Sequence, residues 1–146
     1  MTLAASPMLA LLLLVLAGQA RPDFSGEWTR VADRSDEFAE TIVVTHTADV
    51  LTISDPKSGA IVRTLRLDGS ENKIVHGKPP RGVVEVVRAT WEGSSLVLKG
   101  SGSSPEAAYL LRGEYSLDGN RLIVQVTQTN PTTGALLREQ KFVFSK

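Results

Sequence analysis

The segment AAYLLRGEYSLDGNRLIVQVTQTN, residues 107–130, decides the fold class, because apolar and polar side chains alternate on both sides of Asp118-Gly119. Alternation with a period of two is typical of a half-buried β-strand, and Asp-Gly accepts the positive φ angles of a tight hairpin turn. The same scheme recurs upstream, where Val83 to Trp91 faces Leu96 to Lys99 across Glu92-Gly93. The sequence therefore predicts consecutive antiparallel hairpins.

The rest of the chain continues this pattern. Thr41 to Thr45 and Val50 to Ile53 are short β-branched runs joined by a polar turn, and a further strand is expected near Ile74. The one candidate helix is a short turn at residues 34–39, with Ser35 as its cap. Eight to ten strands without βαβ spacing predict an all-β, antiparallel, up-and-down barrel, which leaves few exposed edges.

The first twenty residues predict a secretory signal peptide. They carry no charged side chain, contain an apolar run from Met8 to Ala17, and end in Gly18-Gln19-Ala20, a small-x-small cleavage pattern. The run is too short for the roughly 20 residues of a membrane-spanning helix. We therefore expect cleavage after Ala20, a single domain at residues 21–146, and a periplasmic or extracellular location.

Composition argues against several classes of function. The chain has 16 Lys and Arg against 16 Asp and Glu, with no dense basic run, which disfavours nucleic acid and anionic membranes as partners. There is no cysteine, and His46 and His76 lack a third ligand at metal-site spacing. The segment at 33–37 lacks the spacing of a calcium loop. We expect no catalysis, no metal and no cofactor.

The serines are too closely mixed with glycine to indicate a nucleophile. They cluster in GSSLVLKGSGSSP, residues 93–105, whose second half has the composition of a turn or linker. No catalytic signature surrounds them. The serines are therefore expected to lie in turns and linkers rather than to carry chemistry.

The stretch PDFSGEW, residues 22–28, resembles the first strand of the calycins, the superfamily of lipocalins and fatty-acid-binding proteins, through its Gly26-x-Trp28 motif. Together with the leader, RSDEF at 34–38 and ATWEG at 89–93, it looks most like a group of uncharacterised bacterial secreted lipocalin-like proteins. The resemblance implies that Trp28 closes one end of the barrel beneath a basic side chain of the last strand. Of Arg138 and Lys141, Arg138 is the expected partner because its planar head can stack on the indole ring.

Two departures weaken the likeness to fatty-acid-binding proteins. Their helical lid is missing, because Glu40-Thr41 leads almost directly into the second strand, and Gln140 stands where an Arg-x-Tyr pair would place tyrosine. Fatty-acid binding of that type is therefore not expected.

The predicted function is that of a monomeric barrel that holds a small apolar or amphipathic ligand in its open end. Parity with Trp28, Trp91 and Tyr115 selects as candidate ligand residues Ile42, Val44, Leu65, Leu67, Leu111 and Val124, and Glu85, Trp91 and Tyr115 complete the set. The aliphatic members equally suit a plain core. An inward Glu85 would need a partner such as Arg63 or Arg112, whereas a bulge would turn it to solvent, the outcome that the flanking valines favour.

The alternative function is a protein-binding module or inhibitor that uses the loop VHGKPPRG, residues 75–82.

Overall fold

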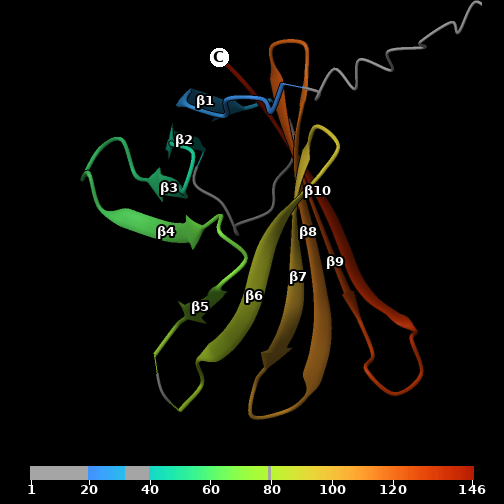
Figure 1. Cartoon of the computed structure of the whole chain (residues 1–146). Coiled ribbons are helices and arrows are strands. Elements are labelled where there is room, and N and C mark those ends of the chain that lie inside the picture. Colours follow the sequence, from blue (N-terminus) through green and yellow to red (C-terminus); the bar gives the residue numbers. More distant parts are fainter. Residues whose placement is uncertain (1–19, 32–39, 79) are drawn as a thin grey trace, which may run out of the picture.

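The described residues form a single antiparallel sheet of ten strands (Figure 1). The computed structural model describes residues 20–31, 40–78 and 80–146. The strands are β1 (Gly26–Arg30), β2 (Thr41–His46), β3 (Val50–Ser54), β4 (Ile61–Arg66), β5 (Glu71–His76), β6 (Val83–Glu92), β7 (Ser95–Ser103), β8 (Ala108–Asp118), β9 (Arg121–Thr129) and β10 (Leu136–Ser145). The prediction of an all-β, up-and-down arrangement with up to ten strands is confirmed.

Two predicted segments cannot be compared with this structure. The helical turn at 34–39 lies outside the described residues, as does the signal peptide apart from its last residue. The described residues contain no helix, and hence none with the length and apolar character needed to cross a membrane.

Strand order follows the chain except at one point. The order is β4-β3-β2-β1-β10-β9-β8-β7-β6-β5, so the first strand pairs with the last, and β4 and β5 are the two edges. Figure 1 shows β1 to β4 running across the longer strands β6 to β10. The sheet therefore curls into a barrel whose seam lies between β4 and β5.

The side chain of Asn72 bridges the start of the seam. Asn72 of β5 accepts a hydrogen bond from the Arg66 amide at 2.7 Å and donates one to the Arg66 carbonyl at 3.1 Å. Its amide thus replaces a backbone partner at the start of the seam, which explains why this polar residue is buried. Beyond it the two strands have no ladder in common.

Both predicted hairpins form, but each turn begins at the glycine rather than at the acid before it. Glu92 pairs with Ser95 and Asp118 pairs with Arg121, so the acids end their strands. The turn glycines, Gly93 and Gly119, have φ angles of 61° and 60°. Positive φ at the first turn position is what a two-residue β-hairpin needs.

The strand predicted at Leu96 to Lys99 is confirmed, but the interpretation of the serine-glycine stretch that follows it as turn or linker was wrong up to Ser103. Ser95–Ser103 is the nine-residue strand β7, at the centre of the longer strands. Its glycines serve close packing: a Cβ on Gly100 would collide with the backbone of Val86, and one on Gly102 would collide with the ring of Tyr109. Glycine composition here reflects neighbours that approach closely, not flexibility.

Candidate functional site

Trp28 is buried at one end of the barrel. Its side chain is 1% exposed, and its indole nitrogen donates to the Phe24 carbonyl at 2.9 Å. The Lys146 ammonium lies 4.9 Å from the ring centroid. Gly26, at φ 144°, makes room for this cation, because a Cβ there would stand 2.8 Å from the Lys146 Cε. We call this the closed end.

The prediction that Arg138 covers Trp28 was wrong. Strand β10 meets β1 through Phe144 and Ser145, whereas Arg138 pairs with Gln128 of β9. Seven residues of extended chain separate Arg138 from Ser145, which is roughly 23 Å at the usual strand rise. The first and last segments do meet through a cation over Trp28, but the cation is Lys146.

The predicted aliphatic ligand residues all belong to the hydrophobic core or pack against it. Buried members are Ile42, Val44, Leu65, Leu111 and Val124, while Leu67 is partly buried against them. Tyr115 is 2% exposed and Trp91 is half-buried. Parity therefore identified the inner face of the sheet, where most of these side chains pack against one another.

Glu85 faces the barrel interior. Strand β6 pairs with β5 and β7 in unbroken register from Val84 onward, so the alternative of a bulge was wrong. One carboxylate oxygen accepts from the Tyr109 hydroxyl at 2.7 Å, and the other lies 3.1 Å from His76 Nε2. We call Glu85, His76 and Tyr109 the Glu85 group.

The expected cationic partner of Glu85 takes a smaller part. Arg112 is exposed and pairs with Glu92 at 3.2 Å, so it was the wrong choice. Arg63 lines the same cavity and donates to the Tyr115 hydroxyl at 3.2 Å, and its charge favours the ionised carboxylate from a distance. Hydrogen bonds from His76 and Tyr109 do most of what the cation was expected to do.

Opposing influences act on the Glu85 carboxyl. Burial is the largest and would raise its pKa, because a charge is poorly solvated inside the barrel. Hydrogen bonds from His76 and Tyr109, and the charges of His76 and Arg63, together outweigh it, so the net pKa is lowered. The group therefore holds a carboxylate at neutral pH.

Sequence reasoning missed Tyr109 as part of this site. Gly102 faces Glu85 on one side and Tyr109 on the other, and its missing side chain leaves room for the Tyr109 ring. The sequence offered one indication: Gly102 falls on an inward-facing position of its strand, and the next strand carries Tyr109.

The Glu85 group borders an interior cavity toward the end opposite Trp28, which we call the open end. Its apolar wall comes from Ile74, Leu98, Leu111 and Val126. Polar atoms come from Glu85 and His76 of the Glu85 group, together with Arg63, Tyr115 and Gln128. The space left for the centre of a water molecule is about 20 Å³, sufficient for roughly one ordered water.

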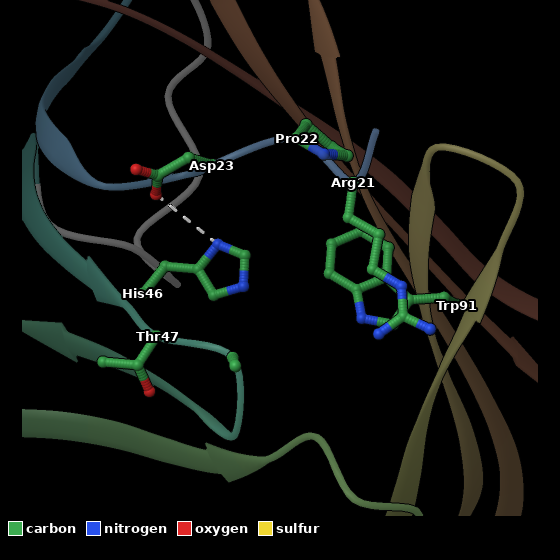
Figure 2. A pocket seen from close by; sticks show the side chains of 7 residues that line it. Arg21, Pro22, Asp23, His46, Thr47 and Trp91 are labelled. Atoms are coloured by element: carbon green, nitrogen blue, oxygen red, sulfur yellow. Dashed lines mark ion pairs between the residues drawn. The ribbon is translucent and has the colours of Figure 1, made fainter. Parts of the chain in front are cut away.

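Trp91 belongs to a separate pocket at the closed end, which we call the Trp91 pocket (Figure 2). It is formed by residues 21–23 ahead of β1, residues 46–48 at the end of β2, and Trp91 of β6, and its volume is about 320 Å³. This size lies within the range of small-molecule sites. The two locations are at opposite ends of β6.

Comparison with known proteins supports the fold. No known protein family and no curated protein matches the sequence. Among solved structures, the chain is similar to a secretary abundant heat soluble (SAHS) protein from Ramazzottius varieornatus, with a TM-score of 0.52 and 14% identity over 89% of this chain and 99% of that one. At this identity the likeness concerns the fold alone.

Proposed function

We propose that this protein is an exported binding protein without catalytic activity, which holds a small amphipathic molecule in the open end of its barrel. The polar end of the ligand would contact the Glu85 group and its apolar part would lie against Leu98 and Leu111. The observation that carries the proposal is a carboxylate, 7% exposed, on the inner wall of the barrel beside a cavity. Interior charges are costly, and replacing them with apolar residues is often neutral or stabilising.

The chemistry of the wall indicates the polar end of the ligand. A carboxylate has about four lone-pair sites, and the Glu85 group uses two of them. On β10, the side-chain oxygen of Gln140 is buried and has no hydrogen-bond partner among the described residues; Gln140 lies opposite the cavity residue Val126 of β9. Both features offer acceptors, so a ligand with a hydroxyl or another neutral donor fits this wall better than a carboxylic acid.

Access for such a ligand requires movement, because the part of the interior lined by described residues has room for about one water. The seam between β4 and β5 is suited to this movement. It lacks a backbone ladder, and Arg63 stands on the edge strand β4. Widening the seam would move Arg63 away from Tyr115 and enlarge the cavity.

Matched ligand pairs test the proposal. Octanol with octanoate, and retinol with retinoate, differ only in the polar end, and binding to the native state raises the melting temperature. We expect the alcohols to stabilise the protein more than the acids, and Glu85→Gln to abolish that preference. If no member of the panel changes the melting temperature or the tryptophan fluorescence, the proposal is wrong.

A protein-binding function is the second candidate, and one observation favours it. The loop after β5, through Pro80 and Arg81, and the loop between β7 and β8, through Ser104 to Glu106, line a hollow of about 560 Å³ at the open end. Internal hydrogen bonds hold both loops, including Ser104 to Ala107 at 2.9 Å and Arg81 to Lys78 at 3.2 Å. A partner captured from envelope extracts of the parent organism should be lost when residues 78–81 are replaced by Gly-Ser-Gly-Ser.

A further inference from the structure

The Trp91 pocket has an aromatic wall whose rings are fixed by one another. The rings of Phe24 and Trp91 are nearly parallel, 5.9 Å apart at 6°, and His46 stacks on both at 5.5 and 5.9 Å. Phe24 is fully buried beneath this set, whereas Trp91 keeps part of its ring open to the pocket. A planar ring entering the pocket would therefore find the indole and imidazole rings already held in place, with the Arg21 guanidinium over the Trp91 ring.

His46 presents a hydrogen-bond donor to the same space. Its Nδ1 accepts from the Phe24 amide at 3.2 Å, so in the neutral ring the proton is on Nε2. Burial, opposed by the nearby Asp23, lowers the His46 pKa, which keeps the ring neutral at pH 7. Figure 2 shows the second ring nitrogen directed into the space between His46 and Trp91. No residue of the described chain accepts a hydrogen bond from it, although the side chain is only 8% exposed.

The charges of the pocket are arranged asymmetrically. The Arg21 guanidinium lies 5.4 Å from the Trp91 ring centroid, and among the described residues no carboxylate pairs with it. Asp23 lies on the opposite side of His46, 3.6 Å from Nδ1, and its carboxylate already accepts from the Ser25 amide at 2.9 Å (Figure 2). The side of the pocket next to Trp91 is therefore positive and rich in donors.

We propose that the Trp91 pocket is a second binding site, distinct from the barrel interior, for a small planar aromatic carboxylate. The ring would pack against Trp91 and His46. The carboxylate would accept from His46 Nε2 and pair with Arg21. Both donors are needed to hold an anion at a site that also lies near Asp23.

Calorimetric titration of the purified protein with 2-naphthoate tests this proposal. Neutral 2-naphthalenemethanol and the non-aromatic cyclohexanecarboxylate are the matched ligands, and both should bind more weakly. Arg21→Gln should weaken 2-naphthoate binding about tenfold, as expected for a lost charge-assisted contact. Because Arg21 is exposed, this variant should keep the fold. His46→Asn, which retains an acceptor for the Phe24 amide, should also weaken binding.

Two controls separate this site from the interior one. Arg81→Gln removes an exposed cation at the other end of β6 and should leave the affinity for 2-naphthoate unchanged. Glu85→Gln should likewise have no effect, and saturation with octanol should not compete. Equal binding of the alcohol and the acid, an Arg21→Gln affinity equal to that of the wild type, or no binding of 2-naphthoate up to millimolar concentration would each overturn the proposal.

Discussion

The two ends of the barrel are filled by different chemistry. At the closed end, Phe24, Trp28 and Trp91 pack as rings, and the polar atom of Trp28 is satisfied by the backbone. At the open end, the interior holds an ionised carboxylate, a histidine and a tyrosine hydroxyl. Apolar packing contributes stability directly, while a buried carboxylate mainly recovers the cost of its own desolvation.

This difference indicates that the closed end mainly stabilises the fold, whereas the open end is the part suited to function. The closed end joins the first strand to the last through Lys146 and Trp28, and so holds the sheet together where chain order is interrupted. The open end lies beside the unpaired seam and carries polar groups that an efficient core would not contain. Substitutions at the closed end should therefore change stability most, and those at the open end should change its pH dependence and ligand preference.

Trp28→Ala should produce the largest effect, a loss of about 3 to 5 kcal/mol in the free energy of unfolding. The reason is the removal of a large, fully buried ring together with its hydrogen bond to Phe24. Urea titration followed by circular dichroism measures it. Tyr109→Phe is the open-end counterpart and should cost about 1 kcal/mol. If it costs as much as Trp28→Ala, the contrast between the ends is wrong.

Gly102→Ala should cost about 1 to 3 kcal/mol, because its methyl group would occupy the position of the Tyr109 ring. The displaced ring would also lose its bond to Glu85. Gly113→Ala is the matched control, since its Cβ would stand 3.3 Å from Leu98 Cδ1 and 3.4 Å from Leu98 Cβ, a much milder conflict than the one at Gly102. Equal unfolding free energies for the two variants would show that Gly102 does not position Tyr109.

Glu85→Gln should cost about 1 to 2 kcal/mol at neutral pH through the loss of charge-assisted hydrogen bonds. The Glu85 pKa is below its ordinary value of 4.5, so its stabilising contribution is present above that pH and is lost as the pH falls through the native pKa. The wild type should therefore lose more stability than the variant between pH 6 and pH 3. Parallel urea titrations measure the difference. Superimposable pH profiles would mean that Glu85 is not held as a carboxylate.

Local patterns in the sequence were sufficient for the strands and turns. The alternation around Asp118-Gly119 and Glu92-Gly93 depends on neighbours in sequence, and the pleat fixes which side chains share a face. The inward position of Glu85 follows from the same parity once its strand is unbroken. The serine and glycine composition within residues 93–105 wrongly indicated a turn or linker. The glycines of β7 are instead required by the close approach of Val86 and Tyr109 on the adjacent strands.

Contacts between strands that are distant in the sequence could not be predicted from it. Arg138 and Lys146 are both cations of the last segment, and only the offset between β1 and β10 decides which one meets Trp28. Tyr109 could not be paired with Glu85 before the register of β6, β7 and β8 was known. The aromatic side of the Trp91 pocket likewise depends on how residues 21–24 lie against the end of β2, for which no sequence period exists.

Lys146→Met should give the smallest effect, a loss of about 0.5 kcal/mol, because cation–π contacts at exposed sites contribute little. Methionine keeps the apolar stem near Gly26 and removes only the charge, so the emission maximum of Trp28 is a more sensitive measurement than stability. In a Trp91→Phe background, Lys146→Met should shift that maximum. Arg138→Met should leave it unchanged, since the offset of β10 places that side chain far along the strand. The reverse result would return Arg138 to the closed end and would contradict the pairing of β1 with the final residues of β10.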